Sequence, residues 1–221
     1  MTSVEKHYAD FCWVIKMRIK NLDVCLAQYP EGLFETESIA LQLRKLIEGV
    51  FFASLIPNGE GLNLSKTKLG KLWRINEILE KIKSINPNYY PKRYKIIQCD
   101  SDDTMKRMEF IENKIDEADL LAFHGRLGVV LHEINPHRQS NDFNWVREEA
   151  KGLLQDLAEQ MWNHVVTSTT GDVFIASFNE FSSDDVRVQK AEPADNSEMK
   201  RKFENWFAEE GLADLPWGDK L

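Results

Sequence analysis

Apolar residues in the first part of the chain recur every three or four positions, which is the spacing of one face of a helix. Residues 4–29 carry one such seam, and residues 36–56 carry a second. Pro30 follows the first seam and Pro57 follows the second. Proline is typical of helix ends because it cannot continue the hydrogen-bond ladder. We therefore expect two long helices joined by a short turn.

The same periodicity over residues 65–85, 116–132 and 142–164 predicts three further helices. Between the first two of these, residues 94–112 contain two short β-type runs around an acidic turn. Such a pattern predicts a small hairpin. Pro136 follows the second of these helices and favours an end there, because proline disfavours helical geometry at the residue before it.

The C-terminal part of the chain changes to alternating and β-branched residues. Residues 173–179 and 186–191 flank a polar turn and predict a β-hairpin. Residues 197–209 repeat aromatic residues at helical spacing and predict a short amphipathic helix, which would either dock a partner or fold back onto the domain. The chain is expected to divide into three parts, which are a helical domain (1–168, with the hairpin 94–112), a hairpin appendage (169–192) and an acidic tail (193–221).

Composition limits the cellular setting. The net charge is −8 and 43% of the residues are apolar, which is typical of a soluble domain with a full core. The apolar run at 50–56 is too short to span a bilayer, and residues 1–10 carry charges where a signal peptide is apolar. We expect a cytoplasmic protein without membrane contact. The three cysteines form no CxxC pair, so neither a metal site nor a cofactor is expected.

Positive charge is concentrated in one segment despite the acidic total. Residues 66–95 hold nine basic residues against two acidic ones. Such a stripe can follow the phosphates of a nucleic acid, but it is also the ordinary solvated face of a helix. Lys71 and Arg74 are the candidates for phosphate contact in this stripe, and both interpretations stay open at this point.

The main chemical pattern lies at the end of the fourth expected helix. The motifs of P-loop and dinucleotide enzymes, α/β-hydrolases and zinc proteases are absent. Arg126 precedes His132 by six positions, and a polar loop follows. RNA cleavage without a metal needs these two residue types, because histidine can move the proton of a 2′-hydroxyl and arginine can bind the charged phosphorane. In this interpretation Asn135 is a positioning group, and His137 and Arg138 add positive charge.

Helix geometry restricts how these two residues meet. An ideal helix places residues six apart about 120° from each other. Arg126 and His132 therefore converge only if the helix unwinds near His132, or if they meet across a dimer interface. Gly125 and Gly128 share a helix face with His132 and would let another helix or a ligand approach closely.

Arg44 and Glu48 lie one turn apart on the second expected helix, and Glu37 lies on the same side. One interpretation is a ladder of ion pairs within the helix, with each pair contributing about 0.2–0.5 kcal/mol. The other is that the charged groups face a binding pocket. The sequence leaves both open.

The spacing of Arg126 and His132 resembles the HEPN group (higher eukaryotes and prokaryotes nucleotide-binding domains). Nuclease members of this group carry an arginine, usually a polar residue next to it, and a histidine after a short spacer; this chain has Leu127 at the polar position. The resemblance implies a helical bundle, usually dimeric, from a bacterial defence or toxin–antitoxin system. It also implies that His132 is the general acid/base and that Arg126 is the phosphate clamp.

Over residues 35–190 the chain is similar to an uncharacterised bacterial family. The shared features are a long helix over 39–55, an Asn-Pro-x-Tyr-Pro stretch present here at 86–91, a helix that ends in Leu-His before Asn-Pro, and a C-terminal β element. An arginine commonly precedes that asparagine in the family, whereas this chain has Ile134.

The fold expected from these observations is mainly α: a HEPN-like bundle of about five helices with a small C-terminal β-hairpin and a short terminal helix. The leading hypothesis is a homodimer that is either a metal-independent endoribonuclease or an inactive relative, with RNA, an antitoxin or another defence-system protein as partner. The alternative is a non-catalytic dimeric interaction module that docks a partner through the segment around Trp206. A small-molecule sensor with a pocket between helices is a third option.

Overall fold

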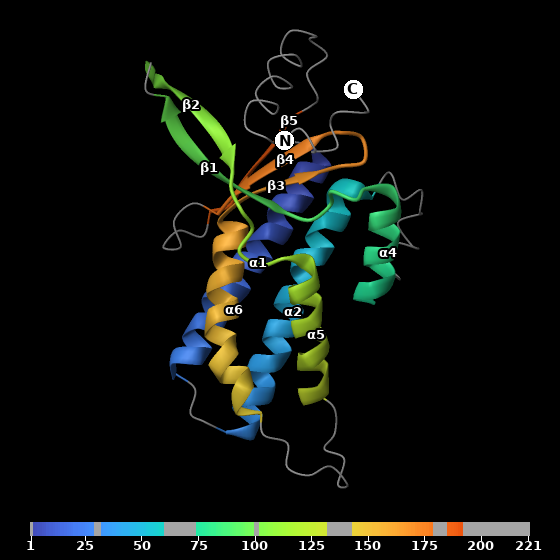
Figure 1. Ribbon diagram of the computed structural model, residues 1–221, viewed down its shortest axis with the longest axis vertical. Helices are drawn as coiled ribbons and strands as arrows, with labels where there is room; N and C mark the ends of the chain where they lie inside the picture. The colour runs from blue at the N-terminus through green and yellow to red at the C-terminus, as the bar shows by residue number, and fades with distance from the viewer. Residues whose placement is uncertain are drawn as a thin grey trace.

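The computed structural model describes residues 2–28, 32–59, 74–99, 102–131, 143–178 and 185–191. The helices of this part are α1 (Ser3–Gln28), α2 (Leu33–Asn58), α4 (Ile75–Ile85), α5 (Glu117–Val130) and α6 (Asn144–Trp162). The strands are β1 (Lys92–Cys99), β2 (Asp102–Phe110), β3 (Asn163–Thr167), β4 (Val173–Ser177) and β5 (Arg187–Ala191). The helices form a bundle and the strands form one sheet across one end of it (Figure 1). The prediction of a mainly helical protein with a small β element is confirmed.

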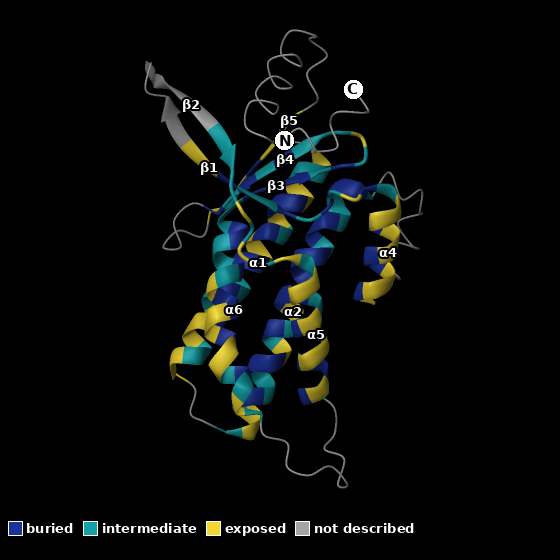
Figure 2. Ribbon diagram, in the orientation of Figure 1, coloured by how far each residue is buried: buried dark blue, intermediate teal, exposed yellow. Residues whose placement is uncertain are grey.

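Helices α1 and α2 form an antiparallel pair at the centre of the bundle (Figure 1). The buried side chains of this pair include those that recur at helical spacing in the sequence, such as Tyr8, Cys12, Ile15, Ile19 and Leu22 on α1 and Ile39, Leu43, Leu46, Ile47 and Val50 on α2. Full burial of one large apolar side chain contributes about 1.5–3 kcal/mol. The repeated spacing therefore places a large share of the core on these two helices, and the remainder comes from the other helices and the sheet (Figure 2).

Helix α6 packs against α1 and α2, and α5 packs against α2 (Figure 1). Helix α5 begins after Asp116, whose carboxylate accepts a hydrogen bond from the backbone N–H of Asp119 at 2.8 Å. A side-chain cap of this kind contributes about 1 kcal/mol, because it satisfies a donor that the first helical turn leaves open. The expected start at Asp116 therefore agrees with the structure.

The five strands form one antiparallel sheet in the order β2-β1-β3-β4-β5. The expected hairpin over 94–112 is present as β1 and β2, and the C-terminal hairpin is present as β4 and β5. Strand β3 lies between the two hairpins and joins them. The pairing of β1 with β3 comprises Lys92 with Val165 and Arg93 with His164. The rest of the first hairpin extends away from the bundle (Figure 1).

Strand β3 was not expected from the sequence. The helix expected over 142–164 ends at Trp162, and Asn163 takes an extended conformation as its C-cap. The following residues include Val165, Val166 and Thr167, whose β-branched side chains fit a strand better than a helix. The helical prediction was therefore wrong at its last two positions, where pairing with β4 determines the backbone.

Asn86 joins three parts of the fold. Its amide nitrogen donates to Asn58 Oδ1 at 2.9 Å and to the carbonyl of Thr167 at 2.7 Å, while its side-chain oxygen accepts from the N–H of Asn88 at 3.0 Å. Asn58 ends α2, Asn86 follows α4 and Thr167 ends β3. The Asn-Pro stretch at 86–91 thus has a structural role at the junction of bundle and sheet.

Parts of several expected elements lie outside the described residues. These are residues 65–73 of the helix over 65–85, the whole tail helix over 197–209, and the end positions 29, 132, 142 and 179 of four other elements. Within the described part, every helix is too short or too polar to cross a bilayer.

Candidate functional site

The structure describes four of the side chains that the sequence singles out, which are Arg44, Glu48, Arg74 and Arg126. The other predicted site residues lie outside the described residues: Lys71, His132, Asn135, His137 and Arg138. Arg74 is the N-cap of α4 and its Nη1 lies 3.3 Å from Glu77 Oε1, on an exposed surface. The remaining three lie on α2 and α5, and they define two clusters on either side of α5.

The first cluster lies in the seam between α2 and α5. Glu48 Oε1 is 3.1 Å from Arg44 Nε and 2.9 Å from His124 Nε2. The side chain of His124 is 10% exposed, whereas those of Glu48 and Arg44 are 27% and 33% exposed. One carboxylate oxygen therefore links a buried histidine of α5 to a partly exposed arginine of α2.

Gly128 makes this arrangement possible. A Cβ atom on Gly128 would lie 2.8 Å from Arg44 Nη1, which is closer than a methyl group and a guanidinium nitrogen can approach. Gly125, one turn earlier, has open space where its Cβ would be. The close approach expected at the two glycines therefore occurs at Gly128, where the guanidinium of Arg44 lies against α5.

Arg44 keeps part of its hydrogen-bonding capacity. Of the two carboxylates that flank it in sequence, Glu48 pairs with it. Within the residues that the structure describes, Glu48 is its one hydrogen-bond partner, so Nη1 and Nη2 donate to no other protein group there. The local ion-pair interpretation is correct for Arg44 and Glu48, but the pair is also part of an interhelical cluster.

The second cluster holds Arg126 on the other side of α5. Arg126 Nη1 and Nη2 lie 2.8 and 2.6 Å from the two carboxylate oxygens of Glu149 on α6. The guanidinium carbon is 4.1 Å from the centre of the Trp145 ring, which meets Phe123 edge to face. The hydrogen bond between Arg126 and Glu149 raises the pKa of Arg126 and lowers the pKa of the Glu149 carboxyl. Both side chains are nearly half exposed, and exposed pairs contribute at most about 1 kcal/mol.

The described part of α5 ends close in sequence to His132. The last helical residue is Val130, and Leu131 is the C-cap, with its N–H bonded to the carbonyl of Leu127 at 3.3 Å. The helix thus ends at Val130, and His132 lies outside the described residues.

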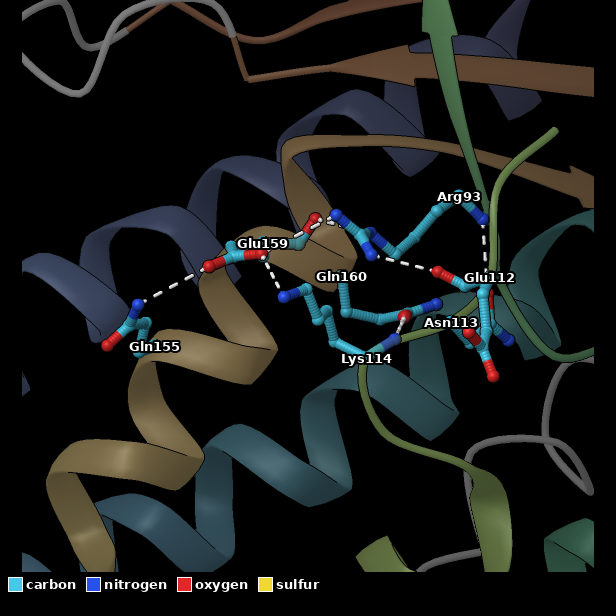
Figure 3. A network of polar contacts seen from close by, with 7 residues as sticks. All are labelled: Arg93, Glu112, Asn113, Lys114, Gln155, Glu159 and Gln160. Atoms are coloured by element: carbon cyan, nitrogen blue, oxygen red, sulfur yellow. Dashed lines mark hydrogen bonds and ion pairs between the residues drawn. The ribbon is translucent and has the colours of Figure 1, made fainter. Parts of the chain in front are cut away.

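Sequence reasoning missed a polar network between α6 and β1 (Figure 3). Glu159 Oε2 is 3.0 Å from Lys114 Nζ and 3.6 Å from Arg93 Nη2, and Arg93 also donates to the backbone carbonyl of Glu112 at 2.8 Å. Hydrogen bonding to Lys114 lowers the pKa of Glu159. No local motif indicates the network, because its members come from distant parts of the chain.

A hollow of about 430 Å³ adjoins this network and is lined mainly by apolar surface, including that of Trp162, Ala158 and Ile111. Its cationic side chains have acidic partners: Arg93 pairs with Glu159, and Lys95 pairs with Glu109 at 2.8 Å. The charged groups around the hollow therefore compensate one another, and they tie the 111–116 loop and β1 to α6.

A buried histidine is a further chemical group that the sequence did not single out. His164 is fully buried; Nε2 lies 2.9 Å from Tyr8 Oη, and Nδ1 lies 2.9 Å from the carbonyl oxygen of Met161. The carbonyl can only accept, so Nδ1 carries the proton and Nε2 accepts from the tyrosine. Burial lowers the pKa of His164 to about 4 and raises that of the neighbouring Cys12 to about 12. These groups are neutral and closed to solvent, which indicates a structural role.

Comparison of the chain with protein-family models, curated proteins and solved structures finds no match.

Proposed function

We propose that the chain is a HEPN-like protein of a bacterial defence or toxin–antitoxin system, acting as a homodimeric, metal-independent endoribonuclease or as an inactive relative that binds RNA or a partner protein. The observation that carries the proposal is the end of α5 at Val130. Arg126 lies near the end of α5, and Leu131 is the C-cap of this helix. A chain that continues beyond this cap without helical geometry would let Arg126 and His132 approach each other.

The proposed chemistry divides between two groups. His132 would accept the proton of the 2′-hydroxyl and return a proton to the leaving oxygen, which a group with a pKa near neutrality can do in both directions. Arg126 would donate two parallel N–H groups to the non-bridging oxygens of the phosphorane. Asn135 would position the substrate, while Lys71, Arg74, His137 and Arg138 would attract the RNA backbone.

Glu149 sets the resting state in this mechanism. It occupies both Nη groups of Arg126, so a phosphate must displace the carboxylate before Arg126 can bind it. The pair is exposed and correspondingly weak, and Trp145 keeps the guanidinium plane in place during the exchange. The resting ion pair is therefore compatible with a phosphate-binding role and would lower the affinity for RNA.

The test is cleavage of a fluorescent RNA in EDTA by the wild type, His132→Ala and Arg126→Ala. We expect cleavage by the wild type and a loss of about 100-fold or more in each variant, because acid–base catalysis and charge stabilisation each contribute on that order. Far-UV circular dichroism checks that the variants fold. Lys45→Ala, which changes an exposed cation of α2, is the matched charge control.

Unchanged cleavage in both variants would contradict the assignment of this pair. Absence of cleavage by the wild type would contradict the nuclease form of the proposal and leave RNA or partner binding, which a gel-shift assay with the same RNA measures.

The alternative, a non-catalytic dimeric interaction module, has support of its own. Phe34 is 79% exposed at the start of α2, next to Leu33 at 44%, and Trp13 on α1 is 45% exposed. Exposed apolar side chains mark a partner surface where they form one patch, and Leu33 and Phe34 are adjacent in the chain. Analytical ultracentrifugation of the wild type and Phe34→Ser distinguishes this role: weaker self-association in the variant, with no RNA cleavage by the wild type, would favour the interaction module.

A further inference from the structure

We infer that Arg44, in the seam between α2 and α5, binds a phosphate-type oxyanion, carried either by free phosphate or by a nucleic-acid backbone. This site lies on the opposite side of α5 from the Arg126 cluster. It requires neither His132 nor RNA cleavage, so it stands or falls independently of the proposed catalytic pair.

The two arginines differ in the groups that they have available. Arg126 uses both Nη atoms to bind Glu149. Arg44 uses Nε to bind Glu48, and within the described residues its Nη1 and Nη2 have no acceptor. An arginine that binds an oxyanion through two parallel hydrogen bonds donates them from two N–H groups on one edge of the guanidinium. Nη1 and Nη2 form such an edge in Arg44, so Arg44 can bind an oxyanion without first losing its ion pair with Glu48.

The orientation of Arg44 is fixed from two sides. Glu48 holds its Nε and is itself held by His124, which is almost buried. Gly128 allows the guanidinium to lie against the α5 backbone. Because the side chain is ordered before a ligand arrives, binding costs less conformational entropy than at a mobile surface arginine. The side chain is also 33% exposed, so a ligand can reach it from solvent.

Two glycines of α5 provide a matched test. In Gly128→Ala the new methyl group must displace Arg44 Nη1, which is the flexible end of a side chain, so the protein should still fold. In Gly125→Ala the methyl group enters open space. Both changes add the same atoms to the same helix and alter no charge. Arg44→Lys completes the set, because it keeps the positive charge and loses the pair of parallel N–H donors of the guanidinium.

The measurement is a titration followed by NMR of the arginine side-chain Nε–Hε signals at constant ionic strength. One arm uses inorganic phosphate, and the other uses an eight-nucleotide 2′-O-methyl RNA, which cannot be cleaved through its 2′ position. We expect saturable shifts of the Arg44 signal in the wild type, Gly125→Ala and His132→Ala. In Gly128→Ala the affinity should fall at least fivefold. For Arg44→Lys, calorimetry with the same ligands should show a similar loss.

The two arms identify the source of the anion. Saturation by phosphate without tighter binding of the RNA supports a free phosphate or phosphomonoester ligand, whereas tighter binding of the RNA supports a nucleic-acid backbone. Equal affinity in the wild type, Gly128→Ala and Arg44→Lys would overturn the inference, as would an Arg44 signal that responds to neither ligand. If the protein cleaves RNA but the Arg44 signal does not respond to either ligand, this inference is overturned and the catalytic proposal is left intact. If the Arg44 signal responds but the protein does not cleave RNA, the catalytic proposal is overturned and this inference is left intact.

Discussion

At the scale of single residues, the partners of a charged group determine what it can do. Arg44 on α2 and Arg126 on α5 carry the same charge. Within the described residues the Nη atoms of Arg44 have no acceptor, whereas those of Arg126 bind Glu149. The sequence predicts the pairing of Arg44 with Glu48, because residues four apart share a helix face. It does not predict His124 as the second partner, because the contact spans 76 residues. Arg126 could likewise be singled out from the sequence, whereas its partner Glu149 could not.

The buried His164 makes stability depend on pH. Its pKa in the folded state is about 4, below the ordinary value of about 6.5 in an unfolded chain. Between these values the unfolded state binds more protons, so the stabilising effect of neutral His164 is present above pH 6.5 and is lost as the pH falls towards 4. We expect a loss of roughly 2 kcal/mol between pH 7 and pH 5 from this group.

Urea unfolding of the wild type and His164→Gln at both pH values measures this effect. The glutamine does not titrate, so the pH-dependent loss should be smaller in the variant by about the amount assigned to His164. An equal loss in both proteins would show that His164 does not titrate between the folded and unfolded states as described.

At the scale of elements, the two faces of α5 contact different helices. One face, with His124 and Gly128, packs on α2, and another carries Arg126 towards α6. Its start was predictable from the capping chemistry of Asp116. The periodicity of the sequence predicted the helices well, because helical contacts are local. It extended α6 too far, because the competing β3 pairing involves β4 and β1.

The stability of α5 should report how tightly Arg44 lies against it. Gly125→Ala should raise the free energy of unfolding by about 0.5–1 kcal/mol, since alanine restricts the unfolded chain and favours helix. Gly128→Ala should gain less, because its methyl group displaces Arg44 and weakens the Arg44–Glu48 pair. Thermal unfolding measures both variants, with Gly152→Ala on α6 as a second open position. Equal gains at Gly125 and Gly128 would contradict the close contact.

At the scale of the whole molecule, one antiparallel sheet unites the two hairpins across the end of the bundle (Figure 1). Each hairpin was predictable, because its strands are neighbours in sequence. Their union through β3 was not, because it depends on pairing between residues about 70 positions apart, such as Lys92 and Val165. Such long-range pairing leaves no periodic signal in the chain.

Asn86 should contribute to the stability of the entire fold. Asn86→Ala removes the donor to Asn58 and to the Thr167 carbonyl and leaves buried acceptors unsatisfied, which costs about 1–3 kcal/mol. Asn88→Ala is the control, because the Asn88 side chain makes a long contact of 3.4 Å with Lys92 and its loss should cost less than about 0.5 kcal/mol. Urea unfolding compares the two. A similar cost for both would contradict the junction role of Asn86.

The direct passage of α6 into β3 has a mechanical consequence. The nineteen residues of α6 form a rod of roughly 28 Å, which carries Trp145 and Glu149 near its first end and becomes a sheet strand at the other without an intervening loop. There is no joint in which a tilt of the rod could be absorbed. A tilt of α6 that separates Glu149 from Arg126 would therefore also move β3, because the strand continues directly from the helix. The sheet at one end of the bundle would then change position when Arg126 is released at the other end.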